Sequence, residues 1–124
     1  MVSFVFVTHS ALLAQGIVEE ARMMAPHVPM LAAGGTKTGA LGTSEEKIDH
    51  AIRQLWSEDG VIVLMDMGSS VLTARLVAED WEGVYLADCP IVEGAVTGSV
   101  LAETGADLQE ILSALSQVAQ EPKL

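Results

Sequence analysis

The chain has 124 residues, half of them hydrophobic, which suits one folded domain over residues 1–124 and excludes a disordered protein. Its 17 acidic and 6 basic residues give a net charge of −11, which argues against a nucleic-acid binder, because such proteins need clustered lysine and arginine. The single cysteine, Cys89, excludes an intrachain disulfide, and no CxxC partner or histidine cluster signals zinc or redox chemistry.

Short apolar runs alternate with helix-like segments along the chain. This alternation is typical of α/β proteins and predicts an open, mainly parallel sheet of four or five strands with helices on both faces. The first strand is expected at Val2–Val7. A helix follows over about Ala11–Ala25, with Ser10 as its N-cap and Pro26 as its stop. A weaker second strand covers about residues 29–33.

A flexible glycine-rich connection, Gly34–Gly42, precedes the second helix. Thr43 is the expected N-cap of this helix, and Glu46 three residues later completes a capping box. The apolar face of this helix consists of Ile48, Ala51, Ile52 and Leu55. The third strand covers Val61–Met65 and ends at Asp66.

The C-terminal half continues the alternation with a third helix over residues 68–79 and a fourth strand at Tyr85–Ala87. Two further helices are expected, near Ile91–Glu103 and over about Leu108–Gln120. The N-terminal apolar run lacks a basic flank, and the later apolar stretches are interrupted by charged residues and proline. We therefore expect a cytoplasmic protein without a signal peptide or a membrane span.

Two polar residues stand at the expected carboxyl ends of neighbouring strands. His9 follows the first strand and Asp66 the third, and a 2-1-3-4 strand order would make these strands adjacent at the point where ligands bind open α/β sheets. A carboxylate bound to one imidazole nitrogen fixes the tautomer and leaves the other nitrogen free as a nucleophile. Helices start nearby at Ser10 and Gly68, and helix N-termini attract anions. The pattern therefore suits a histidine that carries a phosphoryl group without a metal.

Other interpretations stay open on the residues alone. His9 also fits a partly buried histidine with no chemical role, whereas His27 and His50 are expected at the surface. The glycine-rich connection lacks a GxxxxGK[ST] pattern, so a P-loop is not supported. A phospho-aspartate receiver would need an acidic pair after the first strand, and a serine hydrolase would need a GxSxG turn. A pure interaction module without chemistry is a further alternative.

Five segments of the sequence occur in the same order as in a known protein family: Phe6–Ser10, Ala32–Gly35, Leu41–Ser44, Val63–Ser70 and Pro90–Ala95. This order resembles the phosphotransfer subunit of bacterial dihydroxyacetone kinase, the DhaM family. That family is similar to the mannose-type IIA domain of the sugar phosphotransferase system. The resemblance covers essentially the whole chain.

The resemblance implies a homodimeric phosphotransferase component in which His9 carries the phosphoryl group and Asp66 orients the histidine. The group would come from phosphoenolpyruvate through enzyme I and the phosphocarrier HPr. It would pass to ADP on a kinase subunit, which phosphorylates dihydroxyacetone, so this chain itself would bind no cofactor and no metal. The residues that match the rest of the family's site are Ser10, Gly35, Thr43, Gly68, Ser69 and Ser70.

Two residues depart from the family pattern. Thr8 stands where serine is common before the histidine, and it keeps the hydroxyl. Arg75 stands in the third helix where an uncharged or acidic residue is expected, which would alter a partner surface. No HPr-like or enzyme I-like domain is present, so the donor is expected to act in trans. The main alternative within the resemblance is a mannose-type IIA domain that passes phosphate to a sugar-specific IIB domain.

Overall fold

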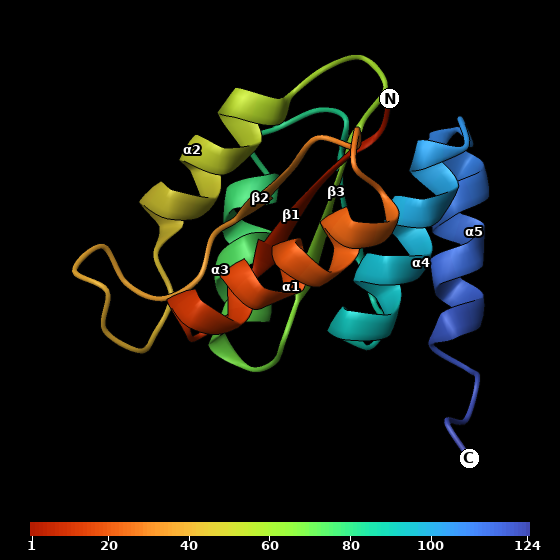
Figure 1. Ribbon diagram of the computed structural model, residues 1–124. Coiled ribbons are helices and arrows are strands. Elements are labelled where there is room, and N and C mark those ends of the chain that lie inside the picture. The colour runs from red at the N-terminus through yellow and green to blue at the C-terminus, as the bar shows by residue number, and fades with distance from the viewer.

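A four-stranded parallel sheet lies at the centre of the computed structural model, which describes residues 1–124 (Figure 1). Its order is β2-β1-β3-β4, with β1 at Ser3–Val7, β2 at Met30–Ala32, β3 at Val61–Met65 and β4 at Val84–Ala87. In the register of β1, Phe4 lies opposite Met30 of β2 and Ile62 of β3. The predicted α/β class and the 2-1-3-4 order are confirmed, with four strands.

Five helices cover both faces of this sheet: α1 at Ala11–Met24, α2 at Glu45–Leu55, α3 at Ser69–Ala78, α4 at Ile91–Glu103 and α5 at Leu108–Val118. Helices α1, α4 and α5 share one hydrophobic core, and α2 and α3 share the other. Figure 1 shows α4 and α5 side by side, with α2 on the opposite side of the sheet. The central strands β1 and β3 are therefore buried on both faces, whereas Tyr85 of the edge strand β4 is exposed.

Alternate residues of β1 belong to the two separate cores. Phe4 and Phe6 pack with α1, α4 and α5, whereas Val5 and Val7 pack with α2 and α3. Helix α4 lies close to the sheet because its buried face is made of small residues. A Cβ atom on Gly98 would lie only 2.9 Å from the ring of Phe4. This packing explains why β1 shows no polar alternation in the sequence.

The predicted N-cap of α2 is wrong by one residue. Ser44, not Thr43, caps the helix, because its hydroxyl accepts the backbone N–H of Lys47 at 3.2 Å. Glu46 forms an ion pair with Lys37 at the surface and takes no part in a capping box. Ser and Thr are both strong N-caps, so two adjacent candidates cannot be separated by residue type. No helix has the length and apolar character needed to span a membrane.

Candidate functional site

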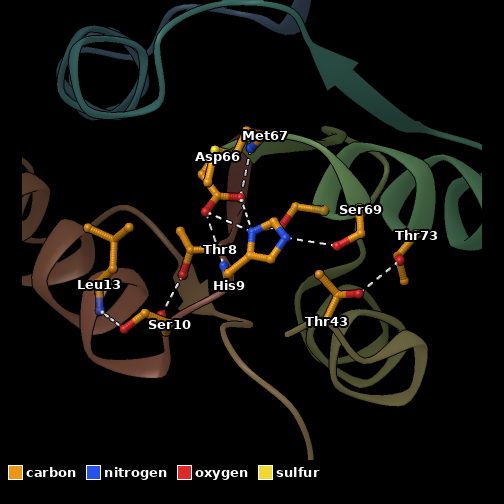
Figure 2. Close-up of polar contacts among 10 residues, drawn as sticks. Thr8, His9, Ser10, Leu13, Thr43, Asp66, Met67, Ser69 and Thr73 are labelled. Carbon is orange, nitrogen blue, oxygen red and sulfur yellow. Dashed lines mark hydrogen bonds and ion pairs between the residues drawn. The ribbon is translucent and has the colours of Figure 1, made fainter. Parts of the chain in front are cut away.

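His9 and Asp66 are in contact at the carboxyl ends of β1 and β3 (Figure 2). Val7 and Met65 end the two strands opposite each other, so parallel pairing places the next residues at the same edge of the sheet. His9 Nδ1 lies 3.1 Å from each carboxylate oxygen of Asp66. The backbone N–H of His9 donates to the same carboxylate at 3.1 Å. Asp66 therefore holds both the main chain and the ring of His9.

The two nitrogens of the imidazole have different partners. Because the Asp66 carboxylate only accepts hydrogen bonds, Nδ1 carries a proton, and in the neutral ring Nε2 then keeps its lone pair. The Ser69 hydroxyl lies 2.8 Å from Nε2 and donates to it, and the Ser70 hydroxyl lies 3.1 Å from Nδ1. The His9 side chain is 29% exposed, so Nε2 becomes accessible once the Ser69 hydroxyl turns away.

Asp66 keeps its negative charge despite its position. Burial alone would raise the pKa of this carboxyl. The Ser70 hydroxyl, the backbone N–H and ring of His9 and the backbone N–H of Met67 donate hydrogen bonds that outweigh burial, and the pKa of Asp66 lies below its ordinary value. The carboxylate is therefore ionised at neutral pH and can stabilise positive charge on the imidazole.

Two helices begin beside the His9 ring. The Ser10 hydroxyl caps α1 by accepting the N–H of Leu13 at 3.2 Å. Helix α3 starts after Gly68, whose φ of 51° favours glycine at this turn. Both helix starts offer free N–H groups and the positive end of a helix dipole. An anion attached to the ring would be stabilised there without a metal ion.

The glycine-rich connection wraps the end of β1. The N–H of Gly35 donates to the carbonyl of Thr8 at 3.0 Å, and the N–H of Gly42 donates to the carbonyl of His9 at 2.9 Å. Gly34 packs so closely that an added Cβ would lie 2.5 Å from a backbone oxygen of the β1–α1 turn. The family resemblance implied a site role for Gly35 but not for Gly34 or Gly42, for which the dense run of glycines was the available signal.

Thr43, which the resemblance implied for the site, contacts a residue of α3 and not the His9 ring. Its hydroxyl lies 3.1 Å from the hydroxyl of Thr73 in α3, and Figure 2 shows this pair below Ser69. The pair links the start of α2 to α3. Thr73 was not singled out in the sequence, where an isolated threonine inside a helix carries no signal.

Three other residues noted in the sequence form no hydrogen bond with the His9 ring, whose partners are Asp66, Ser69 and Ser70. His27 and His50 are exposed, as predicted, and His27 Nδ1 lies 2.8 Å from a Glu103 carboxylate oxygen at the end of α4. Arg75 is exposed on α3 and lines a cavity of about 320 Å³ that also includes Asp66. No group of three or more His, Cys, Asp or Glu side chains could hold a metal ion.

Two relatives match nearly the whole chain. One is the phosphoryl donor subunit DhaM of a PEP-dependent dihydroxyacetone kinase from Providencia stuartii, 35% identical over 97% of this chain. This chain spans only 27% of the length of that relative. The other is the phosphotransferase subunit DhaM of a PTS-dependent dihydroxyacetone kinase from Lactococcus lactis, 33% identical over 94% of this chain and 95% of the relative.

One solved structure shares the fold of this chain, and a family model matches most of its length. The crystal structure of a phosphotransferase system component EIIA from Streptococcus agalactiae superposes with a TM-score of 0.67 at 15% identity, covering 97% of this chain and 93% of the other. This likeness shows a shared fold. The model of the EIIA-man family, described as the PTS system fructose IIA component, matches residues 3–112, and the chain therefore belongs to this family.

Proposed function

We propose that this chain is a histidine phosphocarrier, the phosphoryl donor of a phosphoenolpyruvate-dependent dihydroxyacetone kinase. It takes a phosphoryl group from phospho-HPr onto His9 and passes it to ADP bound on a kinase subunit. One observation carries this proposal: the ring of His9 is fixed through Nδ1 by an ionised Asp66, while Nε2 keeps its lone pair at a partly exposed position. The names of the relatives point to a dihydroxyacetone kinase as the enzyme that uses the phosphoryl group.

The geometry suggests how the transfer proceeds. Nε2 of His9 attacks the phosphorus atom on the donor's phosphohistidine, the bond to Nε2 forms, and the bond to the donor's ring nitrogen breaks. Positive charge grows on the His9 ring and is stabilised by the Asp66 carboxylate 3.1 Å from Nδ1. The Ser69 hydroxyl leaves Nε2 and donates to a phosphoryl oxygen. Free N–H groups at the starts of α1 and α3 supply further donors.

Exchange with other proteins is supported by the surface around His9. Large apolar side chains are exposed on each segment that borders the ring. Leu12 in the first turn of α1 is 80% exposed, Leu41 in the glycine-rich connection 79%, and Met67 before α3 65%. Exposed apolar residues around a polar centre are typical of protein-interaction surfaces. A phosphohistidine of a partner could thus be brought to Nε2 with water excluded.

The partners and the assembly belong to the same proposal. HPr is the donor and an ADP-binding kinase subunit the acceptor, and the chain works as a cytoplasmic homodimer. Ser10, Gly35, Gly68, Ser69 and Ser70 support the phosphoryl group or the backbone that carries it. Thr43 contributes by bracing α2 against Thr73, given its bond to that residue.

The test is to incubate the chain with labelled phosphoenolpyruvate, enzyme I and HPr, and to map the labelled residue by mass spectrometry. We expect label on His9 that is labile in acid and stable in base, and complete loss of label in His9→Ala. His27→Ala is the matched control and should carry label as the unaltered chain does. Label on any other residue, or none at all, would overturn the proposal.

The acceptor is identified by adding candidates to the labelled chain. ADP with a dihydroxyacetone kinase subunit should remove the label and, with dihydroxyacetone bound by its own subunit, yield the phosphorylated product. Transfer to a sugar-specific IIB domain in preference to the kinase subunit would assign the chain to sugar uptake instead.

A further inference from the structure

Lys47 in the first turn of α2 reaches backbone oxygens of the glycine-rich connection. Its half-buried ammonium group lies 2.5 Å from the carbonyl oxygen of Gly34 and 3.5 Å from that of Thr36. The other lysines form ion pairs with surface carboxylates: Lys37 with Glu46 and Lys123 with Glu93. Lys47 therefore differs from them in both burial and partner.

The segment that Lys47 holds is the one that fixes the backbone of His9. One residue beyond Gly34, the N–H of Gly35 donates to Thr8, and at the far end the N–H of Gly42 donates to the carbonyl of His9. The N–H of His9 is held separately by Asp66. Both backbone polar groups of His9 are thus bound, one of them only through this connection.

The glycine-rich connection needs a stabilising contact, because its glycines allow many backbone conformations. Gly35, Gly39 and Gly42 all have positive φ, and glycine loses more conformational freedom on ordering than any other residue. A hydrogen bond from a charged donor is about twice as strong as one between neutral groups. The start of α2 is itself fixed, because the backbone N–H of Lys47 donates to the Ser44 hydroxyl.

We propose that Lys47 is a positioning residue of the phosphoryl-transfer site. By binding the carbonyls of Gly34 and Thr36, it keeps residues 34–42 in the conformation that holds the His9 backbone and so aims Nε2. This inference rests on the proposed function, and it assigns Lys47 no contact with the phosphoryl group.

The test compares Lys47→Met with Lys37→Met. Methionine keeps an unbranched side chain of similar length but removes the charge and the donors. We expect Lys47→Met to lower kcat for charging by phospho-HPr about tenfold with little change in KM, because a small misplacement of the reacting atom slows transfer. The His9 Nδ1–H signal in NMR spectra should shift or broaden. Lys37→Met, in the same connection but paired only with Glu46, should match the unaltered chain in both measurements.

Two controls separate a loss of positioning from a loss of the fold. Circular dichroism establishes that the variant is folded, and Lys47→Gln replaces Lys47→Met, with the same expectation, if the latter fails to fold. An unaltered kcat, or an unaltered His9 signal, in the folded variant would overturn the inference, as would an equal loss in Lys37→Met. Failure of the unaltered chain to accept phosphate would instead contradict the proposed function.

Discussion

Strands β3 and β4 are each followed directly by an aspartate, but the two aspartates lie in different environments. Asp66 after β3 receives hydrogen bonds from His9, Met67 and Ser70. Asp88 after β4 is exposed, and the residue that follows it is the half-buried Cys89. Helix α3 then begins with serines that contact His9, whereas α4 begins after Pro90, and neither helix has a side-chain cap.

The difference shows that the donors around a carboxylate, more than its place in the topology, decide its chemistry. At β3 these donors keep Asp66 ionised and direct it at an imidazole. At β4, burial, followed by the charges of Asp88 and Glu93, raises the pKa of Cys89 to about 11. An aspartate therefore orients the proposed nucleophile, His9, at one strand end, whereas at the other end an aspartate helps to keep a thiol protonated.

Replacing each aspartate by asparagine gives the largest contrast between the two ends. Asp66→Asn should slow charging of His9 by phospho-HPr about 10²-fold, because the ring loses both its orienting acceptor and the negative charge that stabilises it. Asp88→Asn should charge at the unaltered rate. Rapid-quench kinetics of both variants provide the measurement, and equal rates for the two would remove Asp66 from the proposed mechanism.

The depressed pKa of Asp66 also predicts a dependence of stability on pH. Its folded-state value lies below the ordinary value of 3.8, so the ionised carboxylate stabilises the fold above that pH. This contribution is lost as the pH falls from 3.8 through the folded-state pKa. Denaturant unfolding of the unaltered chain and Asp66→Asn should therefore differ most near neutral pH, and the difference should shrink below pH 3.8.

Only the β1 end of the sheet is wrapped by a glycine-rich connection, and a pair of glycine variants tests how tight that wrapping is. A Cβ on Gly34 would meet the Ser10 carbonyl oxygen at 2.5 Å and the Thr8 hydroxyl at 2.8 Å. Gly34→Ala should destabilise the fold by about 1–3 kcal/mol and slow charging of His9. Gly16→Ala, where nothing lies within 4 Å, should stabilise α1 by about 0.5–1 kcal/mol.

Urea unfolding monitored by circular dichroism measures both glycine variants. If Gly34→Ala leaves the free energy of unfolding unchanged, the β1–α1 turn moves readily to accept the added methyl group. The glycine-rich connection would then not constrain His9 as the packing indicates.

The fold and the central pair of the site could be predicted from the sequence because both depend on local patterns. Apolar runs predict the strands, and their alternation with helices predicts a parallel sheet, whereas the 2-1-3-4 strand order entered only as an assumption that the structure then bore out. His9 and Asp66 then meet as a consequence of parallel pairing. The roles of Ser69 and Ser70 came from the family resemblance, and the structure adds which ring nitrogen each hydroxyl contacts.

The contacts of the glycine-rich connection could not be predicted, because they depend on backbone atoms. Gly42 acts through its N–H on the carbonyl of His9, and Lys47 acts on the carbonyl of Gly34. The pattern of side chains in a sequence does not indicate which backbone carbonyls will accept such hydrogen bonds. The misplaced cap at Thr43 has a similar origin, since two neighbouring hydroxyl residues compete and only the backbone direction decides between them.

The smallest expected effect concerns the β4 end and sharpens the contrast with β3. Burial is the leading cause of the raised pKa of Cys89, and the charge of Asp88 comes second. Asp88→Asn should therefore lower that pKa only partly and speed alkylation of the thiol by iodoacetamide a few-fold at pH 8, since the thiolate is the reactive form. Cys89 is the only cysteine, so total alkylation measured by mass spectrometry reports on it alone. A thiol that already reacts as fast as a free one in the unaltered chain would contradict its burial between α4 and the sheet.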